Sequence, residues 1–155
     1  MRAYGVALGR GSVDRRGYSR PVSRTLGILL LVALLAGGCG VRNSKPFTAK
    51  GSAGCLRSHG FTGVTTNPRK VGFIAGFAEN GGIRASSPTG NAVTIAFTAD
   101  ENSVASTEDA FKLRAPKSLR PHMSDILRTN RNAVLVWTIT PLPDELDTAM
   151  RCLKA

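Results

Sequence analysis

The sequence has few of the side chains with which enzymes carry out acid–base, nucleophilic or metal chemistry. It contains two histidines, His59 and His122, and neither belongs to a His-x-x-x-His or Glu-x-x-His pattern typical of a metal site. It has no Gly-x-Ser-x-Gly segment, which would place a nucleophilic serine on a strand-to-helix turn. No set of nucleophile, base and orienting group can be assembled from these residues, so the sequence predicts no catalytic residue, no metal site and no cofactor.

Acidic residues are also few. The formal net charge is +11, from 21 lysines and arginines against 10 aspartates and glutamates, and residues 1–24 hold six of the arginines. The other basic residues are scattered and do not alternate with aromatic side chains, as a surface for single-stranded nucleic acid would require. The composition therefore predicts no nucleic-acid partner. It indicates a mild attraction to anionic lipid headgroups or acidic envelope polymers.

The chain has no apolar run long enough to be a comfortable transmembrane helix. The run from Leu26 to Gly38 has 13 apolar or small residues and no charge. As a helix it would span roughly 20 Å, against about 30 Å for the hydrocarbon core of a bilayer. Four arginines precede it, at positions 15, 16, 20 and 24. A basic segment followed by a short apolar run is typical of a secretory signal peptide.

The apolar run ends in Leu35-Ala36-Gly37-Gly38-Cys39, which resembles the lipobox of bacterial lipoproteins. It departs from the commonest pattern at Ala36, where leucine is usual. The resemblance implies that residues 1–38 are removed and that the Cys39 thiol carries a diacylglyceryl group. Membrane lipid would then hold the chain at the cell membrane, on its extracytoplasmic face. Two alternatives stay open: ordinary cleavage that leaves Cys39 as a spare thiol, and an uncleaved signal anchor.

If Cys39 carries lipid, Cys55 and Cys152 are left as an even pair. Outside the cytoplasm such a pair is normally oxidised, and we predict a disulfide between them. A bond that closes a loop of about 100 residues stabilises the fold by up to about 4.7 kcal/mol in the chain-entropy estimate. Two free buried thiols or a redox-active couple are the alternatives.

Residues 39–52 read as the lipidated cysteine and a flexible tether, and residues 53–155 as one small domain. Three segments predict helices that cover residues 53–59, 100–113 and 124–128, and a last helix follows Pro141 and Pro143 with an apolar stripe that reaches Leu153. Strands are predicted at 61–66, 71–78, 83–86, 93–98 and 133–140, of which 93–98 alternates most clearly and 133–140 is apolar enough to be central.

This order of elements predicts the α+β class: a small two-layer sandwich, with helices covering one face of a mainly antiparallel sheet. A ferredoxin-like arrangement is one candidate topology. The domain also resembles small extracytoplasmic domains of high-GC bacteria that begin with a Cys-Leu helix, here Cys55-Leu56, and end with another helix. That resemblance implies no particular activity.

Two functions remain open at this point. The first is a non-enzymatic module that binds an envelope protein or an acidic envelope polymer. The second is a small extracytoplasmic enzyme or ligand-binding protein that uses His59 or the carboxylates around Asp100, namely Asp100-Glu101 and Glu108-Asp109. A deep pocket that holds a histidine with a perturbed carboxylate would favour the second function, and an exposed apolar patch on a packed sheet would favour the first.

Overall fold

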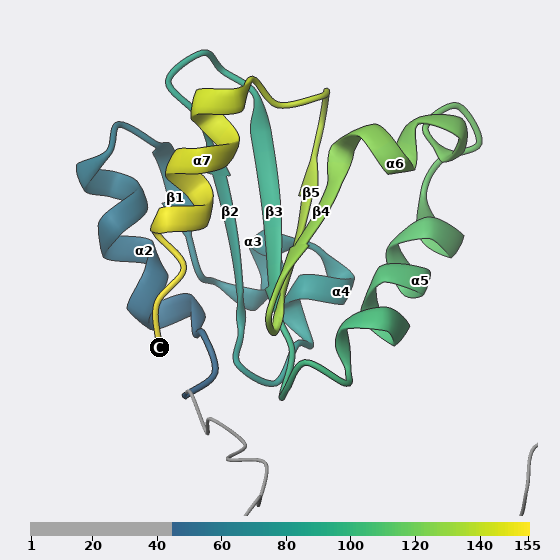
Figure 1. Cartoon of the computed structure of the whole chain (residues 1–155), viewed down its shortest axis with the longest axis horizontal. Coiled ribbons are helices and arrows are strands. Elements are labelled where there is room, and N and C mark those ends of the chain that lie inside the picture. The colour runs from purple at the N-terminus through teal and green to yellow at the C-terminus, as the bar shows by residue number, and fades with distance from the viewer. Residues whose placement is uncertain (1–44) are drawn as a thin grey trace, which may run out of the picture. The chain divides into compact units, whose positions relative to one another are not determined.

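The alternating residues around Val93 form strand β3 (Ala92–Phe97), which lies at the centre of a five-stranded sheet (Figure 1). This computed structural model describes residues 45–155, so Cys39 and the predicted signal peptide lie outside the described residues. The strand order is β1-β2-β3-β5-β4, and every neighbouring pair is antiparallel. The predicted α+β class and antiparallel sheet are confirmed.

The remaining elements follow the chain in a simple order. The other strands are β1 (Thr62–Thr65), β2 (Gly82–Ser86), β4 (Leu127–Asn130) and β5 (Ala133–Trp137). The helices are α2 (Ala49–Ser58), α3 (Pro68–Val71), α4 (Phe73–Gly76), α5 (Val104–Arg114), the 3₁₀ turn η1 (Arg120–His122), α6 (Met123–Ile126) and α7 (Pro143–Arg151). None of these helices is both long and apolar enough to cross a membrane.

Strands β1, β2 and β3 form a meander. The chain then runs through α5, η1 and α6 to the edge strand β4 and returns in a hairpin as β5, which pairs with β3. A ferredoxin-like sheet is built from split βαβ units, whose crossovers join parallel strands. In each such unit a further strand lies between the two strands that the crossover joins, whereas β1, β2 and β3 here lie side by side in chain order, so this strand order does not match that candidate topology.

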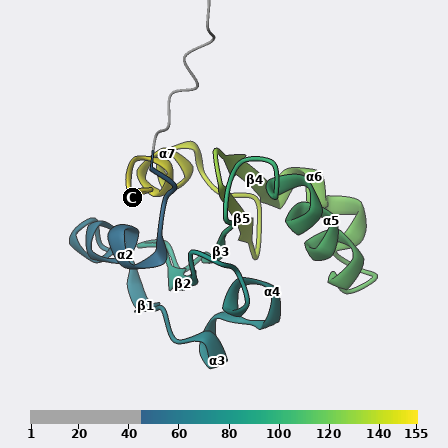
Figure 2. The same ribbon diagram turned by 90° about the horizontal axis from the view of Figure 1, so that it is seen from below.

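Helices lie on both faces of the sheet. Figure 2 shows α2 and α7 on one side, and α3 and α4 on the other, with α5 and α6 beyond β5 and β4. The side chains of Ile83, Ile95 and Leu135 are wholly buried in the larger core, which includes residues of α2 and α7. A second, smaller core joins Val71 and Ala75 to Ala96 of β3. The α3–α4 layer was not predicted, and it carries the exposed phenylalanines Phe73 and Phe77.

Residues 71–78 are not the strand that their apolar content predicts. Asn67 accepts a hydrogen bond from the Arg69 backbone N–H at 3.0 Å, and Pro68 occupies the first helical position, so α3 begins there. Gly72, at φ +95°, separates α3 from α4, a conformation that other residues rarely adopt. The Asn-Pro pair follows the end of β1 at Thr65 and also starts a helix.

The segment 124–128 differs from the predicted helical turn as well. Helix α6 ends at Ile126, and Leu127–Asn130 continues as β4, paired with β5. The hairpin turn between them puts Arg131 at φ +50°. Arginine at a positive φ is uncommon, and the usual Asn-Gly or Asp-Gly signal is missing, so the sequence does not predict this hairpin.

The folded domain begins earlier than the predicted tether allows. Helix α2 starts at Ala49, where the Thr48 side chain accepts a hydrogen bond from the Gly51 N–H at 3.0 Å. Just before it, Phe47 is held by the Asn132 amide, which accepts from the Phe47 N–H at 2.8 Å and donates to the Phe47 carbonyl at 2.9 Å. Residues 45–52 therefore belong to the domain, and the predicted boundary at Ser52 is wrong.

Candidate functional site

The two ends of the domain meet at a disulfide between α2 and the end of α7. Cys55 and Cys152 are joined with an S–S distance of 2.07 Å and a Cα–Cα distance of 5.3 Å, as the cysteine count predicts. Hydrogen bonds reinforce the junction: the Lys154 N–H donates to the Ser52 hydroxyl at 2.9 Å, and the Thr48 N–H donates to the Lys154 carbonyl at 2.8 Å.

His59 lies beside this disulfide, at the C-terminal end of α2. Its Nδ1 is 2.9 Å from the Cys55 carbonyl oxygen, so the ring donates to one of the last carbonyls of the helix, a role that the position of His59 next to Gly60 in the sequence predicts. The same nitrogen is 3.7 Å from the sulfur atoms of both Cys55 and Cys152. This proximity to the disulfide follows from the fold and has no local signal in the sequence.

Cys55, His59 and Cys152 are also the one group of possible metal ligands that the described residues bring together, within 4.8 Å of one another. Metal binding by cysteine requires a thiolate. Both sulfur atoms here are bonded to each other, so in this oxidised form the group offers a single imidazole nitrogen.

His59 also lines a pocket of about 240 Å³ between the start of α7 and the β2–β3 turn. Phe61 and Leu142 give it apolar walls, and Thr148 and Asp144 add polar groups. Glu145 lines the same pocket, so a histidine and a buried carboxylate meet here. The sequence predicts Glu145 only as an acidic residue that suits a helix N-terminus, and its place in a pocket was missed.

Glu145 is 7% exposed, and its hydrogen bonds fasten α7 to the β2–β3 turn. One carboxylate oxygen accepts from the Leu142 N–H at 2.9 Å, which is half of a capping box. The other accepts from the hydroxyls of Ser87, at 2.5 Å, and Thr89. Burial acts to raise the pKa of the Glu145 carboxyl, but the hydrogen bonds from Ser87, Thr89 and Leu142 outweigh it and lower the pKa.

The substitution Glu145→Gln is therefore expected to destabilise the domain by about 1–3 kcal/mol at pH 7, because it leaves a buried hydroxyl or amide donor without an acceptor. A carboxyl whose pKa is lowered in the folded state stabilises the fold above its unfolded-state pKa of about 4.3, and this contribution disappears as the pH falls through the folded-state pKa. Urea unfolding at pH 7 and pH 3 should show that the difference in the free energy of unfolding between the wild-type protein and the variant becomes smaller at pH 3.

The matched control is Glu108→Gln, which removes a half-buried surface carboxylate 2.7 Å from Lys112. Surface pairs of this kind contribute about 0–1 kcal/mol. A difference between wild type and Glu145→Gln that stayed constant down to pH 3 would contradict the role given to the ionised carboxylate.

The other predicted candidates are dispersed. Asp100 accepts from both the N–H and the hydroxyl of Ser103 at 3.0 Å, and the hydrogen bond from the Ser103 hydroxyl is the main reason that its pKa is lowered. Glu101 is 3.5 Å from Arg131, and Glu108 pairs with Lys112. These carboxylates each have a local structural partner, and no metal-ligand group among the described residues includes them.

His122 lies in η1 with its Nδ1 3.8 Å from an Asp125 oxygen, and both side chains are exposed. The place of Trp137 in the middle of the apolar strand 133–140 predicts that it packs in the core; it is 1% exposed and contacts Phe61 with ring centroids 6.5 Å apart. Neither residue therefore contributes a reactive group to an open site.

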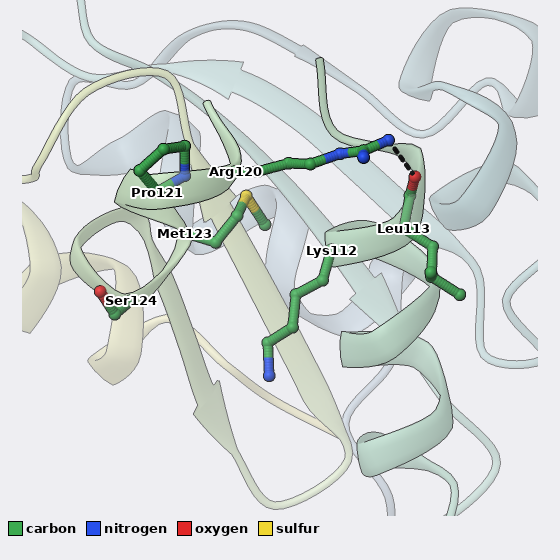
Figure 3. A pocket seen from close by; sticks show the side chains of 6 residues that line it. All are labelled: Lys112, Leu113, Arg120, Pro121, Met123 and Ser124. Carbon is green, nitrogen blue, oxygen red and sulfur yellow. Dashed lines mark hydrogen bonds between the residues drawn. The ribbon is translucent and has the colours of Figure 1, made fainter. Parts of the chain in front are cut away.

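A larger open pocket, of about 400 Å³, lies between α5 and the η1–α6 segment (Figure 3). Its lining contains no histidine and no carboxylate. Figure 3 shows the Arg120 side chain reaching toward the Leu113 carbonyl, to which it donates at 3.2 Å, and it also donates to the Ala115 carbonyl at 3.1 Å. A hydrogen bond to Glu108 raises the pKa of Lys112 on the same wall. Arg120 and Lys112 thus both have partners within the domain, so this pocket is a packing gap between helices rather than a binding site.

The most unusual surface is formed by exposed aromatic rings and arginines around α4. Phe73 and Phe77 are 66% and 78% exposed, and Leu113 of α5 is 76% exposed. The Phe73 and Phe77 ring centroids are 4.9 Å apart, and the Arg114 guanidinium lies 5.0 Å from the Phe73 ring centroid. We call the surface made of Phe73, Phe77, Arg69, Arg84 and Arg114 the Phe–Arg surface.

No protein-family model matches this sequence, and the comparisons with curated proteins and with solved structures return no match either. Function is therefore inferred from the amino-acid sequence and from the described residues.

These residues supply one feature for each of the two functions. The pocket at His59 and Glu145 meets part of the requirement for an enzyme or ligand-binding site. Its two reactive groups, however, are already engaged: the His59 ring with the Cys55 carbonyl and the Glu145 oxygens with Ser87, Thr89 and Leu142. The side chains of the Phe–Arg surface, by contrast, have no hydrogen-bond or ion-pair partner among residues 45–155, which favours a binding function.

Proposed function

We propose that this protein is a membrane-anchored extracytoplasmic lipoprotein whose domain acts as a non-enzymatic binding module. The anchor is inferred from the lipobox resemblance at Cys39. A disulfide that closes the domain is compatible with an oxidising compartment outside the cytoplasm. The observation that carries the binding role is the exposed pair Phe73 and Phe77, since large apolar side chains gathered on a surface commonly mark an interaction site.

A small-ligand-binding role is the second candidate, and the pocket at His59 and Glu145 favours it. Its volume of about 240 Å³ is at the lower limit of ordinary ligand pockets, which hold about 300–1,000 Å³. A ligand there would meet apolar walls and the hydroxyl of Thr148. It would have to compete with the α7 capping contacts for Glu145, so we rank this role second.

The proposal makes a simple prediction about thiols. The sequence has three cysteines, and in the mature lipoprotein Cys39 is a thioether and the other two form the disulfide. The protein purified from its own membranes and then denatured should therefore bind no maleimide before reduction and two equivalents after it, counted by intact mass. One equivalent before reduction would identify Cys39 as a spare thiol, and three before reduction would remove both the anchor and the disulfide from the account.

A further inference from the structure

Helix α4 and the residue that follows it direct two aromatic side chains away from the protein. Its small residue Ala75 is buried against the sheet, and so is Val71 at the end of α3, whereas Phe73 and Phe77 point outward. The approach is close: a Cβ atom at Gly82 of β2 would lie 2.4 Å from the Ala75 carbonyl oxygen, and one at Gly76 would lie 2.6 Å from the Pro68 carbonyl oxygen. Tight backbone packing thus fixes the α3–α4 layer and holds both rings in solvent.

Two shallow grooves flank Phe73. One, of about 230 Å³, is lined by Arg84 and Arg114, and the other, of about 350 Å³, is lined by Arg69 and Phe77. The ring of Phe73 forms a wall of both grooves, so each groove combines an aromatic face with at least one guanidinium.

The arginines of this surface are not neutralised within the fold. Among the described residues, the ion pairs involve Lys112, His122, Arg131 and Arg151. No carboxylate of residues 45–155 lies within 4.0 Å of the guanidinium nitrogens of Arg69, Arg84 or Arg114. The Phe–Arg surface therefore presents apolar rings surrounded by positive charge that is available to an external anion.

We infer that the Phe–Arg surface seats the domain on an anionic lipid bilayer. The rings of Phe73 and Phe77 enter the boundary between headgroups and acyl chains, and the arginines contact lipid phosphates, which guanidinium groups bind with paired hydrogen bonds. This inference rests on the proposed function, because the acyl chains at Cys39 bring the domain to the membrane. Only residues 40–44 lie between Cys39 and the first described residue, Lys45, and a short linker gives an effective concentration in the millimolar range.

A bilayer fits this surface better than an acidic protein does. A standard protein interface takes about 20–30 residues from each partner. The exposed rings here belong to α4, which has four residues, and to the residue that follows it. Together with the four residues of the preceding α3, this segment is much smaller than such an interface. Two adjacent rings with flanking arginines match the smaller requirement of an interfacial contact, in which apolar side chains enter the membrane and basic ones stay at the headgroups.

The test uses the full lipidated protein in vesicles and a tryptophan reporter on the surface. The variant Phe77→Trp places the reporter on the Phe–Arg surface, and Ile139→Trp is the matched control. Ile139 is 64% exposed, and its N–H donates to the side chain of Asn91. Asn91 lies at the opposite end of the sheet from Gly82, against which α4 packs, so Ile139 is remote from the Phe–Arg surface. Both variants keep Trp137, which is 1% exposed and gives the same background. Brominated lipids in phosphatidylglycerol-containing vesicles should quench the added indole strongly in Phe77→Trp and weakly in Ile139→Trp.

The charge requirement is tested in the Phe77→Trp background with Arg84→Gln and Arg114→Gln together. Each basic side chain near an anionic surface favours contact by about fivefold, so this pair should lower the contact equilibrium about 25-fold. Lys50→Gln with Lys154→Gln removes the same charge from the side of the sheet that carries α2 and α7 and should change quenching little. Equal quenching in phosphatidylcholine vesicles would contradict the role of the arginines.

Failure of the inference and failure of the anchor give different results. If the chain sediments with vesicles and carries acyl chains, but the reporters of the two tryptophan variants are quenched equally, the membrane contact is overturned and the anchor stands. If the chain carries no acyl group, the lipid anchor of the proposed function is contradicted, whatever the quenching shows. Shielding of the Phe77→Trp reporter by a soluble acidic protein and not by anionic vesicles would identify a protein partner and would also overturn the inference.

Discussion

The double variant Cys55→Ser/Cys152→Ser should be less stable than the wild-type protein by about 2–5 kcal/mol, with the chain-entropy estimate of about 4.7 kcal/mol as its upper range. The bond joins residues 97 apart, so without it the unfolded chain gains the freedom of nearly the whole domain. Typical domains are stable by about 5–15 kcal/mol, so the loss would be a large fraction of the total. Urea unfolding of the mature protein measures it.

The two single substitutions should each cost about as much as the double one, because either removes the same bond. Reduction of the wild-type protein should reproduce the loss and should leave the double variant unchanged. Additive losses in the single variants would show that the two sulfur atoms stabilise the fold separately, which would contradict the disulfide.

The sequence predicts best where one physical signal dominates. The alternation around Val93 and the apolar stripe of the last helix are strong local periodicities, and β3 and α7 form where they predict. The pairing of Cys55 with Cys152 needed only the count of cysteines and the assignment of Cys39 to lipid. Trp137 is in the core because it lies in an almost wholly apolar strand.

It predicts poorly where the outcome depends on tertiary contacts. The residues from Val71 to Ala78 are apolar enough for a strand, but the Asn67 cap and the φ of Gly72 make them two short helices. Strand β4 has only four residues, and its hairpin depends on an arginine at positive φ. Such short elements owe their structure to the neighbours against which they pack, and no window of sequence contains those neighbours.

The candidate sites show the same division. The position of His59 next to Gly60 predicts a histidine at a helix end, and His59 has that role. The burial of Glu145 depends on Ser87 and Thr89, which lie more than 50 residues earlier in the chain. The exposure of Phe73 and Phe77 is also not a sequence signal, because a phenylalanine is ordinarily predicted to be buried. The Phe–Arg surface is visible only once α4 has been placed against the sheet.

The substitution Cys39→Ser should have the largest effect on where the protein is found. Without the thiol there is no acceptor for the diacylglyceryl group, and we expect the incorporation of a fatty-acid analogue to fall to background. The unprocessed leader should stay on the chain, since in lipoproteins cleavage follows lipid attachment. Labelling with the analogue and electrophoresis of the membrane fraction measure both changes.

Cys55→Ser is the matched control, because it also removes one thiol but leaves the lipobox intact. It should weaken the fold and keep both the label and the cleavage. Unchanged labelling of Cys39→Ser would place the lipid elsewhere or remove it from the account.

The most direct test of the membrane anchor is the mass of the N-terminal peptide of the protein purified from its own membranes. A lipoprotein would give a peptide that begins at Cys39, with the mass of a thioether-linked diacylglyceryl group added to that residue. A peptide that begins at any residue before Cys39, or an unmodified Cys39 thiol, would contradict the proposal that lipid holds this domain at the cell surface.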